Sequence, residues 1–103
     1  MRCTFSSVVI CAPLLTSVSI IASPAEAASQ RECENYARIA VHQFQLTQNA
    51  RFAQRCRVAP SPGWQASYQN HYGWCRTAPS ASVKSERNAR DAHLNRCGAQ
   101  SSL

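Results

Sequence analysis

Apolar residues recur at helical spacing in three stretches of the chain, residues 30–48, 63–75 and 82–97. Between them lie two segments that interrupt helices, APSPG at 59–63 and TAPS at 77–80. The pattern therefore predicts an all-α protein, a small bundle of about three helices.

The first stretch carries the clearest helical signals. Its apolar stripe is spaced by four, three and four residues: Cys33, Ala37, Ala40 and Phe44. Ser29 stands where an N-cap is expected, and Glu32 follows three residues later, as in a capping box. No glycine or proline interrupts residues 47–56, so the sequence leaves open that this helix continues beyond residue 48.

The second stretch carries large aromatic residues on and beside one face. Interpreted as a helix, it places four side chains within a narrow arc, with a tryptophan beside them: Trp64, Tyr68, His71 and Cys75, flanked by Trp74. We expect His71 to be a core histidine within this aromatic group. The alternative is a ligand platform, because tryptophan and tyrosine dominate binding hot spots.

The third stretch combines an apolar stripe with a charged residue. Leu94 and Cys97 fall on the same side as Arg90, and Gly98 follows as a helix terminator. An arginine within an apolar stripe needs a partner, which we expect to be Glu86 one turn earlier. A structural, paired Arg90 is the favoured interpretation, and an anion-binding Arg90 is the alternative.

Residues 1–27 have the features of a cleaved signal peptide. Arg2 supplies a positive start, an apolar run follows, and SPAEA offers small residues for cleavage after Ala27. The run is too short and interrupted for a convincing membrane span, although an uncleaved anchor is the alternative. We expect residues 28–103 to form one small disulfide-linked helical domain, periplasmic or secreted.

Removal of this signal leaves four of the six cysteines, and an even number in a short exported chain indicates disulfides. Helices running up, down and up place Cys33 and Cys75 at one end, and Cys56 and Cys97 at the other. We therefore prefer the pairs Cys33–Cys75 and Cys56–Cys97. A Cys33–Cys97 bridge would have to span a helix of roughly 24 Å, against at most about 7 Å between bridged Cα atoms. Cys33–Cys56 stays open, since a returning loop could bring Cys56 to the first end.

The repeated His-x-x-x-Cys spacing, at His71–Cys75 and His93–Cys97, raises the question of a zinc site. Antiparallel helices send the two pairs to opposite ends, and export to an oxidising compartment favours disulfides over thiolates. Paired cysteines leave no thiol nucleophile, and the few carboxylates are poorly placed for acid–base catalysis. We expect no enzymatic activity, no metal and no other cofactor.

Eleven lysines and arginines against five carboxylates give a net charge of +6. An excess of positive charge favours anionic partners, here an acidic protein or an anionic envelope polymer. The cations are scattered rather than arranged in a stripe with interleaved aromatics, so we expect no specific nucleic-acid partner. The alternative is that the charge serves only solubility.

Nearly all of residues 33–97 resemble a group of small exported four-cysteine helical modules of Gram-negative bacteria. The matching pattern is Cys-x2-Tyr-Ala from Cys33, His-x2-Trp-Cys ending at Cys75, and Glu-x3-Arg-x3-Leu-x2-Cys from Glu86. The chain departs from the group at Arg57, where a glycine usually follows the second cysteine. The resemblance implies a periplasmic or secreted helical module and brings no established activity.

These observations together predict a non-catalytic envelope module that is structural or binds an anionic partner through its basic surface. The candidate binding residues are Trp64, Tyr68, His71, Trp74 and Arg90. The alternative function is a secreted cationic effector or antimicrobial acting on membranes. Against it, the arginines are not segregated on one strongly amphipathic helical face.

Overall fold

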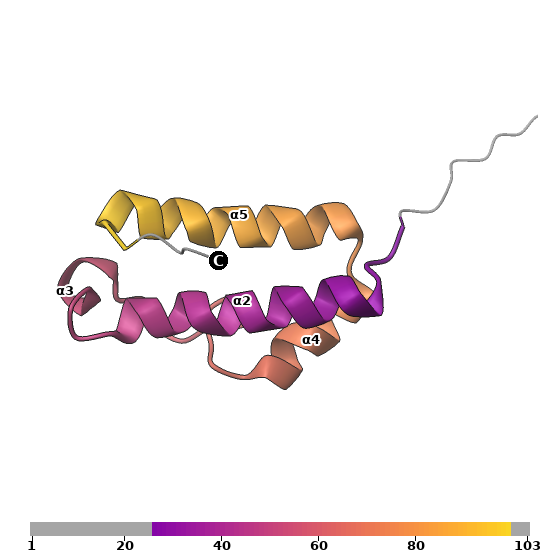
Figure 1. Ribbon diagram of the computed structural model, residues 1–103, viewed down its shortest axis with the longest axis horizontal. Helices are drawn as coiled ribbons and strands as arrows, with labels where there is room; N and C mark the ends of the chain where they lie inside the picture. The colour runs from indigo at the N-terminus through magenta and orange to yellow at the C-terminus, as the bar shows by residue number, and fades with distance from the viewer. Residues whose placement is uncertain (1–25, 100–103) are drawn as a thin grey trace, which may run out of the picture.

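The computed structural model describes residues 26–99, and within them the predicted all-α fold is confirmed (Figure 1). The helices are α2 (Gln30–Gln48), α3 (Ala53–Cys56), α4 (Tyr68–Thr77) and α5 (Ser80–Cys97). Extended pairing in this part of the chain is limited to two isolated β-bridges. The predicted signal peptide, residues 1–27, lies outside the described residues except for Glu26 and Ala27.

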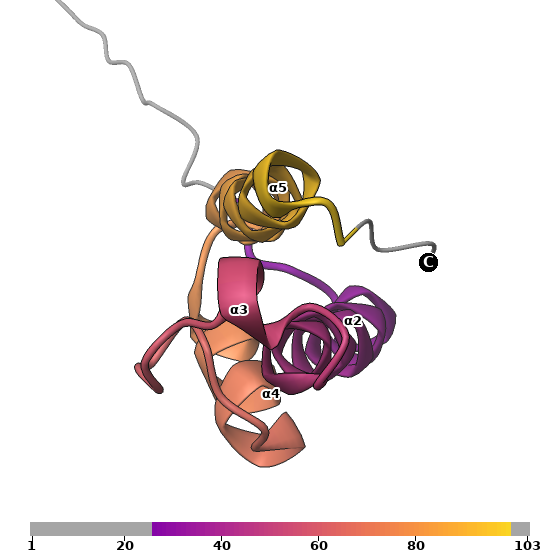
Figure 2. The same ribbon diagram turned by 90° about the vertical axis from the view of Figure 1, so that its left-hand side faces the viewer.

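Helix α2 is the central element of the fold. Helix α5 lies along one side of it and α4 along the other, in both views of the ribbon (Figures 1 and 2). Helix α4 runs opposite to α2, and α5 runs parallel to α2, as the predicted up, down, up order requires. Both outer helices make their main contacts with α2 rather than with each other.

Local signals set most of the helix ends. The Ser29 hydroxyl accepts a hydrogen bond from the Glu32 N–H at 3.1 Å, which confirms the predicted N-cap. Gly98 ends α5 in the left-handed conformation with φ of 88°, as predicted for a helix terminator. Helix α2 stops at Gln48 because the Asn49 side chain accepts from the Arg51 N–H at 2.8 Å and stabilises a turn. The possible extension of this helix is therefore broken, and only the short α3 follows.

The second helix differs from its prediction at the N-terminal end. It begins at Tyr68 instead of residue 63, and residues 61–64 form a tight turn closed by two backbone hydrogen bonds between Ser61 and Trp64. The Ser67 hydroxyl accepts from the Asn70 N–H at 3.1 Å and supplies the N-cap. Pro60, Pro62 and Gly63 disfavour an earlier helix start, so the capping serine determines it.

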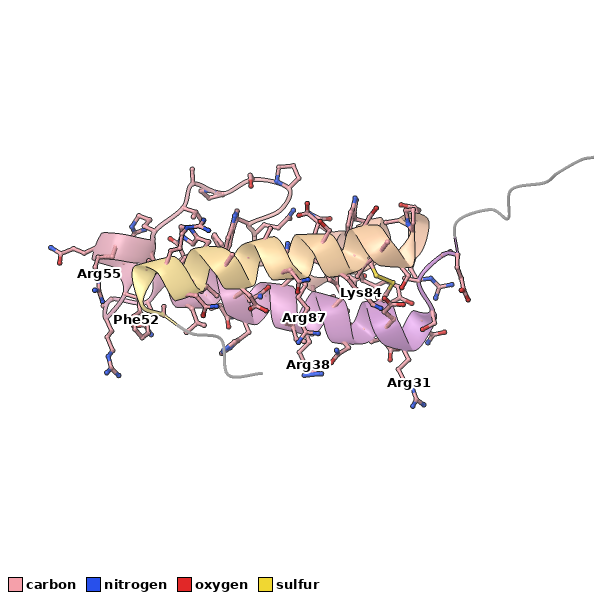
Figure 3. All side chains as sticks on the ribbon, turned by 90° about the horizontal axis from the view of Figure 1, so that it is seen from above. Arg31, Arg38, Phe52, Arg55, Lys84 and Arg87 are labelled. Atoms are coloured by element: carbon pink, nitrogen blue, oxygen red, sulfur yellow. A yellow bond between two sulfur atoms is a disulfide. The ribbon has the colours of Figure 1, made fainter. Side chains whose placement is uncertain are left out.

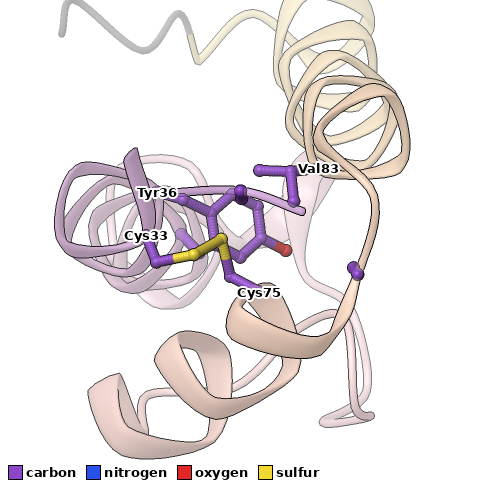
Figure 4. Close-up of a cluster of buried hydrophobic side chains, with 7 residues drawn as sticks. Cys33, Tyr36, Cys75 and Val83 are labelled. Carbon is purple, nitrogen blue, oxygen red and sulfur yellow. A yellow bond between two sulfur atoms is a disulfide. The ribbon is translucent and has the colours of Figure 1, made fainter. Parts of the chain in front are cut away.

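Both preferred disulfides are confirmed, and each ties one end of the fold. Cys33 is bonded to Cys75, with Cα atoms 5.5 Å apart, and joins α2 to α4 (Figure 4). Cys56 is bonded to Cys97, with Cα atoms 5.3 Å apart, and joins α3 to the end of α5. The alternative Cys33–Cys56 pairing is thereby excluded.

The interior consists of two small apolar clusters with a polar layer between them. Each cluster surrounds one disulfide: the first includes Ala28, Cys33, Tyr36, Ala40, Cys75, Ala78 and Val83, and the second includes Cys56, Leu94 and Ala99. Between them along α2 and α5 lie the buried side chains of Gln43 and Arg90. The Arg90 Nε donates to the Gln43 Oε1 at 2.8 Å, so the polar layer is paired across the two helices.

Candidate functional site

The aromatic residues predicted to share one helical face do not form a single group. Trp64 precedes α4 and packs in the second cluster, where its ring lies 5.3 Å from the ring of His93 on α5. This corrects the prediction, whose error arose from placing Trp64 on the helix. His71 and Trp74 instead gather around Tyr36 of α2, which the prediction did not include among the binding residues.

Tyr68 lies in a third place. Its ring stacks on Tyr72 one turn later, with centroids 6.1 Å apart and planes 11° apart, and 39% of the residue is exposed. It lines a hollow of about 570 Å³ together with Arg31 and Arg38 of α2. Tyr68 is therefore an exposed aromatic residue, separate from His71 and Trp74.

An open cleft of about 960 Å³ is lined by two of the predicted residues, His71 and Trp74. One wall is the turn that precedes α4, including Pro60, Pro62 and Gly63. The remaining walls come from three helices: Tyr36 of α2, Gln69, Asn70, His71 and Trp74 of α4, and Glu86 of α5. Segments far apart in the sequence thus converge on one site.

Aromatic rings form part of the cleft lining. The Trp74 ring is tilted by 38° against the Tyr36 ring with centroids 5.6 Å apart, and 40% of Trp74 is exposed. The buried His71 ring meets Tyr36 edge-on at 6.0 Å. The predicted core position of His71 is therefore correct, although its aromatic neighbours are Tyr36 and not Trp64.

Two histidines are hydrogen-bonded to backbone carbonyl groups, and one of them, His71, anchors the turn that forms one wall of the cleft. His71 Nε2 donates to the Gln65 carbonyl oxygen at 2.9 Å, and His93 Nε2 lies 2.8 Å from the Cys56 carbonyl oxygen. In both copies of the His-x-x-x-Cys spacing, the cysteine forms a disulfide and the histidine is hydrogen-bonded to a backbone carbonyl group. In residues 26–99, no three histidines, cysteines or carboxylates come together as metal ligands.

Arg90 lies behind the cleft and contacts several of its walls. It is only 2% exposed, and its Nη1 donates to the Gly63 carbonyl oxygen at 3.1 Å. The same atom lies 3.6 Å from the Glu86 carboxylate, which confirms the predicted partner. The Arg90 Cζ lies 4.9 Å from the centre of the Tyr36 ring. Its Nη2 is buried without a hydrogen-bond partner among the described residues.

The cleft is close to electrically neutral. Burial lowers the pKa of His71, the backbone hydrogen bond to Gln65 raises it, and the nearby Arg90 charge lowers it further. Burial likewise raises the pKa of Tyr36, against the opposing effect of Arg90, so both rings are uncharged near neutral pH. The Glu86 charge is balanced by Arg90 behind it. Among the described residues, no lysine or arginine lines the cleft.

A second candidate site is the end of the molecule that carries α3, where several arginines are brought together in the fold. Arg55 and Arg57 flank Cys56 in the sequence and Arg96 precedes Cys97, so the Cys56–Cys97 disulfide brings the three to the same end of the molecule. Arg51 lies in the turn before α3. All four are exposed, and Arg55 lies at this end in Figure 3. No aspartate or glutamate occurs between Asn35 and Ser85 or after Asp91. We call Arg51, Arg55, Arg57 and Arg96 the arginine end.

Three of these arginine side chains contact other groups of the fold. Arg57 Nη1 donates to the Gln48 Oε1 at 2.8 Å, and the Arg51 guanidinium lies 5.5 Å from the centre of the Phe52 ring. A Cβ added at Gly98 would lie 3.2 Å from Arg55 Nη2, so this guanidinium covers the end of α5. Among the described residues, none of the four arginines forms an ion pair.

Known proteins supply no further assignment. No family model, curated protein or solved structure matches the chain. Within residues 26–99, no helix is both long enough and apolar enough to cross a membrane.

Only some of the residues that line or support the cleft were predicted from the sequence. His71, Trp74 and Arg90 were predicted, and Glu86 was named as the partner of Arg90. The turn at 60–65 and the packing of Tyr36 against Trp74 were not predicted, because they depend on how α2 and α4 pack. The arginine end was missed because the Cys56–Cys97 disulfide joins residues 41 positions apart. The absence of carboxylates between Asn35 and Ser85 was a usable signal.

Proposed function

We propose that this chain is an exported, non-catalytic module of the cell envelope that binds an anionic glycan through its arginine end. The observation that carries the proposal is the grouping of Arg51, Arg55, Arg57 and Arg96 at one end of the fold, where the neighbouring sequence holds no acidic residue. A local excess of positive charge attracts and retains polyanions. The two disulfides are compatible with the oxidising compartment that this proposal requires.

Arginine suits the carboxylate, sulfate or phosphate groups of such a polymer. Its planar guanidinium presents several donors in a fixed fork, and it binds these groups bidentately. Because the four arginines have no ion pairs among the described residues, their charge is not already neutralised within the fold. An anionic ligand would therefore not have to displace an internal carboxylate.

The composition of the arginine end favours a polymer over an acidic protein. Protein interfaces usually have a buried centre of large apolar side chains. The exposed large hydrophobic residues of the described chain are Tyr68 and Trp74, and both belong to α4 rather than to this end. Spaced charges without an exposed apolar centre fit the repeating charges of an anionic glycan better.

A binding experiment on the oxidised chain lacking residues 1–27 tests the proposal. The ligands are polygalacturonate, dextran sulfate and neutral dextran of similar length, each titrated at low and high salt. We expect binding to at least one of the two charged polymers, weakened at high salt because salt screens exposed charges, and none to dextran. The quadruple variant R51Q/R55Q/R57Q/R96Q should bind the charged polymer about tenfold more weakly or worse.

A second quadruple variant provides the matched control. R31Q/R38Q/R76Q/K84Q removes the same amount of charge from exposed positions on α2, α4 and α5. Three of these positions, Arg31, Arg38 and Lys84, are labelled in Figure 3. This variant should weaken binding by less than about threefold. Equal losses in the two variants would mean a response to net charge alone and would overturn the proposed site.

Two further outcomes also contradict the proposal. If neither anionic polymer binds while an acidic protein is captured from envelope extract through the arginine end, the partner is a protein. If the chain instead releases dye from anionic lipid vesicles at micromolar concentration, the membrane-effector alternative is favoured.

A further inference from the structure

The cleft between α2, α4 and the turn at 60–65 has a composition different from that of the arginine end. Its lining combines exposed indole surface, side-chain amides and a single carboxylate, and no cationic side chain among the described residues. A volume of about 960 Å³ lies in the range of small-molecule sites. The question is which class of ligand these groups would recognise.

The charges of the cleft disfavour an ionic ligand. An anion would find no cation among the described residues of the lining and would face the Glu86 carboxylate. A cation would compete with Arg90, whose Nη1 lies 3.6 Å from that carboxylate and balances its charge. The neutral His71 ring adds no charge. The electrostatics therefore favour an uncharged ligand.

The polar groups of the cleft disfavour a purely apolar ligand. Asn70 Nδ2 donates to Gln65 Oε1 at 2.7 Å, which fixes the Asn70 amide and leaves its oxygen as an acceptor. The side chain of Gln69 makes no hydrogen bond within residues 26–99, so both its donor and its acceptor are available. Covering these groups with hydrocarbon would cost free energy, whereas hydroxyl groups would satisfy them.

Trp74 gives the ligand an apolar surface to stack on. Its ring is supported from behind by Tyr36 at 5.6 Å and still leaves 40% of the residue exposed. A large amphipathic ring beside amide groups suits a ligand with one apolar C–H face and hydroxyl groups at its edge. A pyranose ring has this combination.

The cleft is held in shape before any ligand arrives. The guanidinium of Arg90 contacts Gly63, Glu86 and the face of Tyr36, which are three different walls. His71 fixes the turn through Gln65, and Gln65 Nε2 donates to the Pro62 carbonyl oxygen at 2.8 Å. Walls fixed in this way lose little conformational entropy on binding.

From these groups we infer that the cleft binds an uncharged pyranose unit of a glycan, stacked on Trp74 and hydrogen-bonded by Gln69, Asn70 and Glu86. This site is separate from the arginine end and does not depend on it. A glycan with neutral and anionic units could engage both, but the inference concerns the neutral sugar alone.

The test is a titration of the oxidised chain followed by tryptophan fluorescence and by ¹H–¹⁵N NMR of the Trp74 indole and the Gln69 and Asn70 amides. The neutral ligands are trimers of N-acetylglucosamine, β-1,4-linked glucose and α-1,4-linked glucose. Trigalacturonate and adenosine serve as anionic and nucleoside comparisons. We expect saturable shifts of these three side chains with at least one neutral trimer, and weaker binding of trigalacturonate and adenosine.

Two exposed aromatic residues supply matched variants. Trp74→Ala should weaken binding of the neutral trimer about tenfold or more, because it removes the stacking surface. Tyr68→Ala changes an aromatic residue of nearly equal exposure, 39% against 40%, that does not line the cleft, and should change affinity less than about twofold. Gln69→Ala, at an exposed position, should weaken binding several-fold without altering the melting temperature.

Several results would overturn the inference. One is the absence of saturable shifts with all three neutral trimers up to about 10 mM, which corresponds to a free energy of binding weaker than about 3 kcal/mol. Another is an equal loss of affinity in Trp74→Ala and Tyr68→Ala. A third is tighter binding of trigalacturonate or adenosine than of the neutral trimers at the same three side chains. The quadruple arginine variant should bind the neutral trimer like the unaltered chain. Failure here is therefore distinguishable from failure of the anionic-glycan proposal.

Discussion

His71 shows how one residue serves both the core and the cleft. Its ring is buried against Tyr36, its Nε2 holds the turn at Gln65, and it forms part of the cleft lining. The neutral ring suits all three roles, because a charged ring would have to be desolvated beside the Arg90 guanidinium. A protonated His71 therefore destabilises the native state.

Because the native state requires a neutral His71, we expect the stability of the fold to fall at acidic pH. Because folding lowers the pKa of His71 below its ordinary 6.5, the unfolded chain takes up a proton first as the pH falls. The contribution of His71 to stability is thus complete above about pH 6.5 and is lost progressively below it. His71→Gln removes this proton uptake, so the stability difference between the two proteins should shrink as the pH falls from about 7.5 to 5.

Urea unfolding at a series of pH values measures this difference. Effects of the carboxylates occur in both proteins and cancel in the comparison. A difference that stays constant across the range would contradict the prediction. If His71→Gln does not fold, the ring pKa of the unaltered protein, followed by NMR, provides the same test: a value at or above 6.5 would contradict it.

Arg90 is the other residue whose role depends on its surroundings. In the sequence it interrupts an apolar stripe, and in the fold it links Gln43, Gly63, Glu86 and Tyr36. The pairing with Glu86 was predictable from their spacing of one helical turn. The contacts with Gln43 and Gly63 were not, because they join residues 47 and 27 positions apart.

At the scale of the helices, capping serines determine where α2 and α4 begin. Ser29 and Ser67 accept from the N–H groups of Glu32 and Asn70, each at 3.1 Å. Helix α5 follows Pro79 and lacks a side-chain cap. The sequence identified the cap of α2 but overlooked Ser67, because aromatic periodicity appeared to extend the second helix back to residue 63.

The cap of α2 can be tested directly. Ser29→Ala removes the acceptor for the Glu32 N–H and should lower the free energy of unfolding by about 1 kcal/mol. In a domain of this size such a loss lowers the melting temperature by roughly 4–8 °C. Ser85→Ala, at an exposed position within α5, is the control and should be neutral or slightly stabilising because alanine favours helix. Equal melting temperatures for Ser29→Ala and the unaltered chain would contradict a stabilising role for the cap.

At the scale of the whole molecule, the two disulfides compensate for a divided core. Each apolar cluster is small and is built around one bridge, with Gln43 and Arg90 between them. The bridges close loops with sequence separations of 42 and 41. Constraining the unfolded chain in this way stabilises the fold by about 4 kcal/mol per bridge in the chain-entropy picture.

The two bridges should have different local effects. Helix α4 makes its main contacts with α2, and Cys33–Cys75 is the covalent link between them. In C33A/C75A we expect the amide protons of α4 to lose protection from hydrogen exchange more than those of α5. In C56A/C97A the loss should be greater in α3 and the last turn of α5, which that bridge joins.

Hydrogen exchange with peptide-level resolution, on oxidised proteins, measures these patterns. A uniform loss of protection in both double variants would mean that the molecule opens as one unit, and would contradict separate stabilisation of its ends. If either double variant is unfolded, the amide protection of both variants can be compared at lower temperature in a stabilising osmolyte. A uniform pattern there would carry the same meaning.

The helical class, the N-cap of α2, the terminator of α5 and the Glu86–Arg90 pair could be predicted from the sequence, which also favoured the observed disulfides without excluding Cys33–Cys56. These follow from short-range spacing and from the limited reach of a disulfide between oppositely directed helices. Only the packing of the helices placed Trp64 apart from His71, brought the Tyr36 ring against Trp74, and put Arg90 behind a cleft. The physical reason is that helical periodicity gives the face of a residue within its own helix, whereas the rotation and separation of α2, α4 and α5 decide which faces meet.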